Sequence, residues 1–368
     1  MDSVHPRTQR GHRRIFIAPD PAMAGTQSSL QPSFLQMLKS KRFRTVAATA
    51  IFLITILIFF APPEYVRGFR SAQFEPSTDQ SVDWSRFAYA QYVTNTEYLC
   101  NSVMLFERLH TLGTKADKLM MYPADFSVGD TSVEGRLLLK AKNEYGVKLT
   151  PIEVQRRQSG DHTWAESYTK LLAFNQTQYE RVLGLDSDST VIQLMDELFL
   201  LPPCPVAMPR AYWLDDKDNF LSSQIVLVQP SAMEFERVTK AIASAGPDDY
   251  DMEIFNNLYG KSAMIIPHRR YDLITRAFRE DHKVSYLGNE VEEWDPDQVL
   301  EEAKFLHFSD WPVPKPWIPD YSKIEEYKPP CTDDGKNCRA QTLWLGFYSD
   351  FAKRREEVCS IKVPPKPS

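Results

Sequence analysis

The chain has 368 residues, enough for one large domain or two ordinary ones, and a hydrophobic share of 43%, enough for a folded core. Residues 1–70 hold ten Lys and Arg against three Asp and Glu, whereas the remainder holds 33 against 46. A body with a net charge of about −13 argues against nucleic-acid binding through a basic groove.

The first 84 residues predict a membrane attachment. Residues 1–44 are rich in Pro, Ser, Gln and Arg, as in a disordered tail, and residues 45–61 carry no charge, as in a short transmembrane helix. A buried core helix is the alternative for 45–61. Lys and Arg precede the apolar run, and positive residues stay cytoplasmic. We therefore expect a cytoplasmic tail over 1–44, a signal-anchor helix over 45–61 and a luminal stem over 62–84, as in a single-pass type II protein of the Golgi or endoplasmic reticulum.

The cysteines fit a luminal body, where disulfides persist. Cys331 and Cys338 flank a polar loop and could pair, but spacing does not determine pairing, and an odd count leaves at least one thiol over. Asn175 begins the sequon Asn-Gln-Thr, which is relevant only in the lumen. All five cysteines lie beyond the expected membrane span: Cys100, Cys204, Cys331, Cys338 and Cys359.

Strands and helices alternate through the body from about Trp84. Strands are predicted over 87–93, 118–122, 147–151, up to Leu185, and over 224–228, and helices over 96–112, 133–145, 166–175, 232–245 and 251–259. This alternation predicts an α/β fold with a mostly parallel sheet flanked by helices. We place this domain at 85–320, with a Cys- and Pro-containing C-terminal extension over 321–368.

Asp186 and Asp188 follow the short strand that ends at Leu185. Residues two apart on an extended chain point to the same side, so we expect the two carboxylates together. Two such anions repel unless a cation lies between them, and Mn²⁺ or Mg²⁺ suits carboxylate oxygens. Asp-x-Asp is also typical of a solvated turn, but this pair lies beyond the carboxyl end of a strand, where ligands of such sheets bind.

A second polar segment follows the acidic stretch 290–304. His307 ends an apolar run, and Lys315 lies between Pro314 and Pro316. A histidine there is usually a core or surface residue, and a lysine between prolines is usually exposed. Together they allow a different interpretation, because an imidazole can complete a Mn²⁺ shell and a rigidly held ammonium can contact a phosphate.

These motifs resemble those of family 8 glycosyltransferases of the GT-A fold. The spelling HFSDWPVPKPW further resembles the fungal branch called glucose N-acetyltransferase, a group of Golgi N-acetylglucosaminyltransferases. The matching elements occur in the family's order over roughly residues 85–320. They are Tyr92-Val-Thr-Asn95 with Tyr98, Lys170 before Leu185-Asp-Ser-Asp188, Asp251-Met-Glu-Ile-Phe-Asn256, and His307 with Lys315-Pro-Trp317.

The resemblance implies roles for the matching residues and a retaining transfer from a UDP-sugar, with UDP-N-acetylglucosamine as the favoured donor. It fixes no nucleophile, so front-face attack is the default. Its implied metal ligands are Asp186, Asp188 and His307, holding Mn²⁺ or Mg²⁺. Its implied donor contacts are Lys315 at the diphosphate and Thr94, Asn95 and Tyr98 at the nucleotide, and its implied catalytic candidates are Asp251 and Lys170.

The sequence departs from the family pattern near the phosphates and the sugar. Asp310 stands where the family usually has Gly, the interval from His307 to Lys315 is longer, and Met252 replaces a Gln. We therefore expect a differently shaped phosphate loop and leave the donor sugar open. UDP-glucose or UDP-galactose, a nucleotide-sugar hydrolase, and a non-catalytic luminal member of the fold remain alternatives. The implied acceptor is a fungal glycan or glycoprotein in the Golgi lumen.

Overall fold

The computed structural model describes residues 82–155, 166–214, 219–246, 249–280, 283–318, 320–332 and 334–362. The expected tail and anchor, and nearly all of the expected stem, lie outside these ranges. Within them, no helix has both the length and the apolar character needed to cross a membrane.

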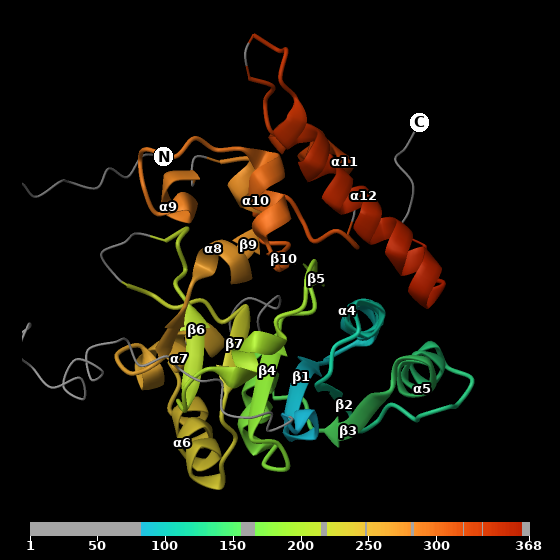
Figure 1. Cartoon of the computed structure of the whole chain (residues 1–368). Helices are drawn as coiled ribbons and strands as arrows, with labels where there is room; N and C mark the ends of the chain where they lie inside the picture. Colours follow the sequence, from blue (N-terminus) through green and yellow to red (C-terminus); the bar gives the residue numbers. More distant parts are fainter. Residues whose placement is uncertain are drawn as a thin grey trace, which may run out of the picture. The chain divides into compact units, whose positions relative to one another are not determined.

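Seven strands form the main sheet (Figure 1). Their bounds are β1 Phe87–Tyr92, β2 Asp117–Pro123, β3 Val147–Ile152, β4 Arg181–Leu185, β6 Val206–Pro209, β7 Ile225–Val228 and β8 Met264–Ile266. The strand order is β3-β2-β1-β4-β7-β6-β8. The first four strands are parallel, as predicted, but β7 runs antiparallel to both β4 and β6, so the sheet is mostly rather than wholly parallel.

A second sheet of three short strands lies beyond β4. It contains β5 Ser189–Val191, β9 Leu273–Ile274 and β10 Phe305–His307, in the order β5-β10-β9. β10 pairs antiparallel with β5, which follows the two aspartates directly, and parallel with β9. This small sheet brings the predicted histidine segment to the end of β4.

Four of the five predicted helices agree closely with helices of the structure, which also contains helices that the sequence did not predict. Asn95 and Ser132 accept N–H groups as N-caps of the first two, and Gly113 and Gly146 end them in the left-handed conformation. The predicted helix over 166–175 is instead a 3₁₀ helix. The helices are α4 Thr96–Leu112, α5 Val133–Tyr145, α6 Ala232–Ala243, α7 Asp251–Tyr259, α8 His268–Tyr271, α9 Lys283–Leu287, α10 Pro296–Glu302, α11 Tyr321–Tyr327 and α12 Arg339–Cys359, with 3₁₀ helices η1 Trp84–Arg86, η2 Ser167–Asn175, η3 Asp196–Leu200 and η5 Thr275–Phe278.

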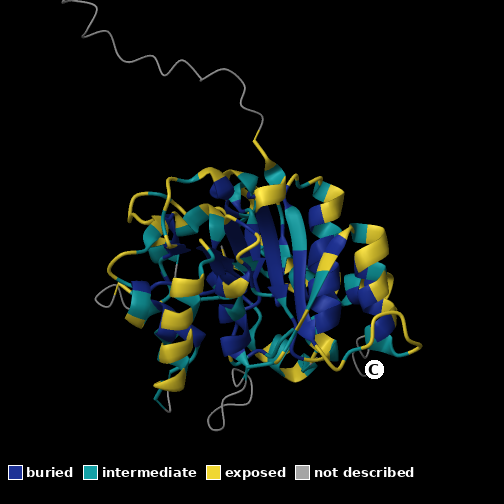
Figure 2. Cartoon of the chain, turned by 90° about the horizontal axis from the view of Figure 1, so that it is seen from below, coloured by how far each residue is buried: buried dark blue, intermediate teal, exposed yellow. Residues whose placement is uncertain are grey.

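The inner strands of the main sheet are buried on both faces (Figure 2). Alternate residues of a strand point to opposite faces. On β4, Leu183 belongs to the core that also contains residues of α4, α5 and α12, whereas Val182 belongs to the core that contains residues of η2, α6 and α7. Polar groups at the carboxyl ends of these strands are therefore the ones left to form a site.

The segment beyond residue 320 contributes to the first core. Trp344 of α12 is fully buried, and a disulfide joins Cys359 at the end of α12 to Cys100 on α4. Cys331 and Cys338 also form a disulfide, the pairing that their spacing suggested, and Cys204 is a free thiol.

Candidate metal centre and donor site

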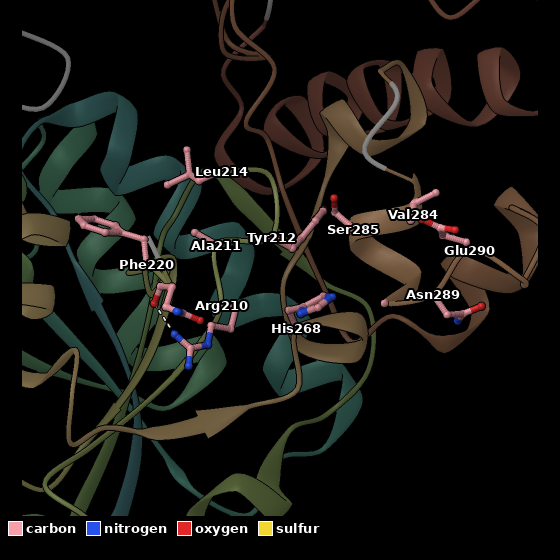
Figure 3. Close-up of a pocket in the computed structure, with 12 residues that line it drawn as sticks. Arg210, Ala211, Tyr212, Leu214, Phe220, His268, Val284, Ser285, Asn289 and Glu290 are labelled. Atoms are coloured by element: carbon pink, nitrogen blue, oxygen red, sulfur yellow. Dashed lines mark hydrogen bonds between the residues drawn. The ribbon is translucent and has the colours of Figure 1, made fainter. Parts of the chain in front are cut away.

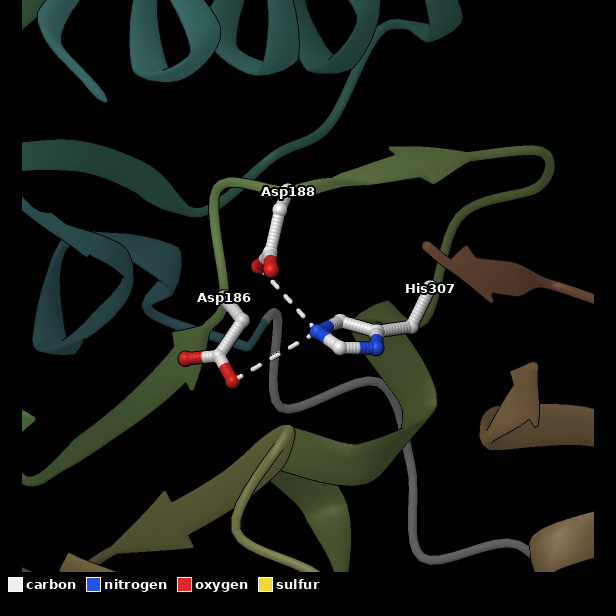
Figure 4. Close-up of side chains that lie close together, drawn as sticks. All are labelled: Asp186, Asp188 and His307. Carbon is white, nitrogen blue, oxygen red and sulfur yellow. Dashed lines mark hydrogen bonds and ion pairs between the residues drawn. The ribbon is translucent and has the colours of Figure 1, made fainter. Parts of the chain in front are cut away.

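Asp186 and Asp188 lie in the bend between β4 and β5. The Asp186 N–H donates to the carbonyl of Gln224 (3.0 Å), and the Ser189 hydroxyl donates to the carbonyl of Asp186. The chain is bent here rather than extended, so the carboxylates converge through the bend and not through strand alternation. Both aspartates turn toward the same imidazole (Figure 4).

His307 completes this group from β10, where it lies opposite Ser189. Its Nε2 is 3.1 Å from Oδ1 of Asp188 and 3.7 Å from Oδ2 of Asp186. One ligand atom from each residue lies within 4.8 Å of the other two. Two carboxylate oxygens and one imidazole nitrogen at this spacing fit a divalent cation such as Mn²⁺. The residues can therefore hold the metal that the sequence predicts.

Lys315 lies against the same carboxylates. Its ammonium is 2.5 Å from Oδ2 of Asp188 and donates to the carbonyl of Phe308 (2.6 Å). Burial raises the pKa of Asp188, but His307 and Lys315 outweigh burial and hold that pKa well below its ordinary value. Burial raises the pKa of Asp186, against the charge of Lys170. A bound cation would favour the ionised form of both carboxylates.

Lys170 links the aspartate pair to Asp251, the other candidate catalytic residue. Its Nζ lies 2.8 Å from Oδ1 of Asp186 and 2.7 Å from Oδ2 of Asp251, and it donates to the carbonyl of Ser223 (2.8 Å). Burial alone would lower the pKa of Lys170. The charges of Asp186 and Asp251 outweigh burial and raise that pKa above its ordinary value, so the ammonium stays charged. The two predicted residues therefore lie together beside the metal ligands.

The expected nucleotide contacts lie at the carboxyl ends of β1 to β3. Thr94 and Asn95 line a groove of about 520 Å³ together with Asp125, Phe126 and Glu153. The Asn95 carboxamide is not free, because it accepts the N–H groups of Glu97 and Tyr98 as the cap of α4. The carboxamide oxygen is thus engaged in the cap, and the N–H₂ group is the part of this side chain left to contact a ligand.

Tyr98 lies on the other side of the cap, near the aspartate pair. Its ring packs edge-on against Trp317 with centroids 5.4 Å apart. Burial, and then the charges of Asp188 and Asp186, raise the pKa of its phenol, so the hydroxyl stays protonated at neutral pH. Tyr98 can therefore donate a hydrogen bond to an anionic group beside the metal ligands.

Some residues of the site carry no signal in the sequence. The Tyr92 hydroxyl donates to Oδ1 of Asp186 (3.3 Å), and the Ser223 hydroxyl donates to Oδ2 of Asp251 (2.7 Å). Tyr92 belongs to the quoted first motif, but nothing in that motif indicates contact with an aspartate 94 residues away. Only the pairing of β1 with β4 brings them together.

Asp310, the departure from the family's glycine, does not contact the predicted ligands. It is buried, and its carboxylate accepts from Nε of Arg279 (2.7 Å), Nε1 of Trp344 (2.6 Å) and the hydroxyl of Tyr348 (3.2 Å). Burial raises the pKa of Asp310, and Arg279 opposes that rise. The side chain thus fastens the segment after His307 to α12.

A second cavity, of about 450 Å³ (Figure 3), lies on the side of the main sheet where β4 ends and the candidate metal ligands follow. It is formed where β6 ends, where β7 begins and where β8 is followed by α8. The strand order places β6 two strands from β4, a lateral separation of about 10 Å at ordinary strand spacing. Its polar and aromatic lining includes Arg210, Tyr212, Phe220, His268, Asn289 and Glu290.

Its relatives identify the chain as a glycosyltransferase. No family model matches the chain. A Gibberella zeae protein named glucose N-acetyltransferase 1 is 57% identical over 285 residues, which are 76% of this chain and 63% of that protein. An Aspergillus fumigatus protein of the same name is 42% identical over 343 residues, 87% of each chain. The chain belongs to this glucose N-acetyltransferase family.

Solved structures also resemble the chain in part. The apo structure of the bifunctional glycosyltransferase WbbM has a TM-score of 0.48 and 13% identity, and covers 73% of this chain and 52% of its own. The galactosyltransferase LgtC, solved with donor and acceptor sugar analogs, has a TM-score of 0.45 and 14% identity, and covers 72% and 95%.

Proposed function

We propose that the chain is a retaining, metal-dependent glycosyltransferase of the GT-A type that moves N-acetylglucosamine from a UDP-sugar to a glycan. The observation that carries this proposal is the group of Asp186, Asp188 and His307, whose ligand atoms lie within 4.8 Å of one another beside Lys315. The fungal branch that the motifs resemble implies N-acetylglucosamine as the transferred group, and Mn²⁺ or Mg²⁺ suits the donor atoms.

The residues around this group suit departure of a nucleoside diphosphate. A bound divalent cation would neutralise the negative charge that grows on the leaving group. Lys315 is placed to add a second positive charge, and such preorganised electrostatic help commonly contributes a few kcal/mol. The Tyr98 hydroxyl can donate a hydrogen bond to a diphosphate oxygen. The site thereby stabilises charge where the glycosidic bond breaks.

Lys170 and Asp251 would orient the sugar. Asp251 is held by the Lys170 ammonium and the Ser223 hydroxyl, both at 2.7 Å from the same oxygen, Oδ2. A carboxylate engaged by two donors in this way suits hydrogen bonding to sugar hydroxyls better than nucleophilic attack. We therefore keep front-face attack as the route to retention and assign Asp251 a binding role.

The second cavity is our candidate for the acceptor. Its lining combines the aromatic rings of Phe220 and Tyr212 with the guanidinium, amide and carboxylate of Arg210, Asn289 and Glu290 (Figure 3). Aromatic faces and planar polar groups together suit a sugar, which has apolar ring faces and hydroxyl edges. Phe220 lies three residues before Ser223, so one short stretch of chain connects the cavity lining to a residue that bonds Asp251.

We further propose a Golgi location for the catalytic body, with residues 45–61 as its membrane anchor. The support is in the sequence: an uncharged run of 17 residues preceded by Lys39, Lys41, Arg42 and Arg44. Expression of the full chain with a tag at either end, followed by protease protection of sealed vesicles, tests this topology. Protection of an N-terminal tag would contradict it.

The activity is tested with residues 71–368 and a panel of UDP-sugars, with UDP release measured in Mn²⁺ and in EDTA. We expect metal-dependent release to be fastest from UDP-N-acetylglucosamine and to rise when a glycan acceptor is added. Faster release from UDP-glucose or UDP-galactose would show that this sugar nucleotide, and not UDP-N-acetylglucosamine, is the donor. Release of UDP that no acceptor changes would favour a hydrolase. No metal-dependent turnover of any donor would overturn the enzyme proposal.

A further inference from the structure

Side chains of helix α12 contact several residues of the segment from His307 to Trp317, here called the lysine segment. The Phe308 ring lies 5.0 Å from the Phe351 ring, Asp310 accepts from Trp344 (2.6 Å), and the Trp317 ring lies 5.9 Å from Phe351. The contacting residues of α12 are spaced to share one face of the helix: Trp344, Tyr348, Phe351 and Arg355.

Arg355 joins α12 to both the lysine segment and α4. Its side chain is only 1% exposed, and its guanidinium donates to Asn101 and forms an ion pair with Glu97, both on α4. The guanidinium carbon also lies 5.9 Å from the Trp317 ring centroid. Only a planar guanidinium can donate in two directions and also present a flat cationic face to an indole ring.

The position of Trp317 bears directly on Lys315, two residues earlier. Pro314 and Pro316 flank the lysine, fix two φ angles of this segment and restrict the backbone of Lys315 itself to extended conformations. Trp317 is packed between Tyr98 (5.4 Å) and Arg355, and the Lys315 ammonium lies 2.5 Å from Asp188. A displaced indole ring would therefore carry the ammonium away from the metal ligands.

We propose that Arg355 is a positioning residue for the donor diphosphate: it holds Trp317 against α4 and thereby keeps Lys315 at the metal centre. This inference rests on the proposed function of the site as a UDP-sugar site. It makes the C-terminal helix part of the donor site, although none of the donor-contacting residues proposed above lies on that helix.

The first test compares two neighbouring arginines. Arg355→Lys keeps the charge but loses the planar group, and we expect the Kd of UDP in Mn²⁺, measured by titration calorimetry, to rise about tenfold, which is about 1.4 kcal/mol. Arg354→Lys is the matched control. Arg354 also bonds to α4, through Glu107 and the Met104 carbonyl, and none of its described contacts is with the lysine segment. We expect it to change the Kd less than twofold.

The second test asks whether Arg355 acts through Trp317. We expect Trp317→Phe to weaken UDP binding, and the Arg355→Lys/Trp317→Phe double variant to bind more tightly than the product of the two single effects predicts. A merely structural role would lower the Tm while leaving the Kd of folded protein unchanged. Equal Kd values for Arg355→Lys and the control, or additive effects in the double variant, would overturn the proposal.

A third readout does not depend on the proposed function. Acetylation of Lys315 by an amine-reactive ester, followed by mass spectrometry, should be several-fold faster in Arg355→Lys than in Arg354→Lys, with an exposed lysine such as Lys353 as the internal standard. Unchanged labelling of Lys315 would contradict the positioning role. Faster labelling in a chain that binds no UDP would retain that role and reject the donor site instead.

Discussion

Nε2 of His307 lies 3.1 Å from Oδ1 of Asp188, although 119 residues separate the two along the chain. The antiparallel pairing of β10 with β5 produces this contact, because it sets His307 opposite Ser189, the residue after Asp188. Two strands of a small secondary sheet therefore assemble the candidate metal centre, while the main sheet positions Asp186 and the residues around Lys170.

Removal of the imidazole should abolish metal binding. Mutation of a group that only hydrogen-bonds to a metal ligand lowers metal affinity roughly 10–100-fold. Because His307→Ala removes a ligand itself, we expect its Mn²⁺ affinity to fall by more than that. Calorimetry measures the affinity, and the Mn²⁺-induced rise in Tm should vanish with it. Asp297→Asn, which changes a carboxylate 54% exposed and remote from the site, should bind Mn²⁺ normally. Undiminished Mn²⁺ affinity in His307→Ala would remove the residue from the ligand set.

Asp272 should make the protein less stable as pH rises. It is fully buried, no described group donates a well-formed hydrogen bond to its carboxylate oxygens, and burial raises its pKa to about 8. A raised folded-state pKa contributes stability that is complete below the ordinary pKa of 3.8 and is lost as pH rises toward about 8.

Asp272→Asn removes this ionisation at nearly constant shape. In metal-free buffer, urea unfolding should show that the free energy of unfolding of the variant rises relative to that of the wild type between pH 5 and 8. The expected rise is at most about 1.4 kcal/mol per pH unit. The exposed Asp297→Asn variant should show a constant difference over the same range. A difference in the free energy of unfolding between wild type and Asp272→Asn that does not change with pH would contradict the raised pKa.

Asp310 should matter for stability more than its place in the motif suggests. Asp310→Gly would leave Arg279, whose side chain is 8% exposed, without its buried partner, and would deprive Trp344 and Tyr348 of an acceptor. Breaking a buried ion pair from one side costs about 3–5 kcal/mol. Asp310→Asn keeps an acceptor and should cost less. Urea unfolding that ranks the asparagine variant as the less stable of the two would refute this account.

The two disulfides should contribute unequally. The Cys100–Cys359 bond closes a loop of 259 residues, whereas Cys331–Cys338 closes one of 7. Constraint of the unfolded chain grows with loop length, and disulfides commonly contribute about 2–4 kcal/mol. We expect Cys100→Ser/Cys359→Ser to lower the Tm more than Cys331→Ser/Cys338→Ser, as measured by calorimetry without reductant. Equal losses would show that the long disulfide does not act through chain entropy.

Local sequence patterns predicted β1 to β4, β7 and the helices α4 to α7, but not the remaining strands or the long helix α12. The ranges of α4, α5 and α7 follow from apolar spacing and from residues such as Asn95 and Gly146 that begin and end helices. The patterns did not predict the antiparallel direction of β7, because a strand's hydrophobicity is the same in either direction. They also did not distinguish the 3₁₀ helix η2 from an α-helix.

The site was predicted through its motifs rather than its geometry. Asp186, Asp188 and His307 were named from their residue types and order, and the structure brings them together. The stated reason for the aspartate pair was wrong, since a bend and not an extended strand makes the carboxylates converge. Thr94 and Asn95 both line the expected groove, and the helix cap uses only the carboxamide oxygen of Asn95.

By itself, the sequence determined the class of fold, the ends of elements such as β1, α4 and α5, and the chemical types of the candidate ligands. These depend on contacts between residues close in the chain. Only the tertiary structure decided that Lys170 pairs with both Asp186 and Asp251. It also decided that Asp310 bonds to α12 and that Arg355 packs on Trp317. Such partners are separated by many residues, and their meeting depends on strand order and helix packing, which no local pattern of residues encodes.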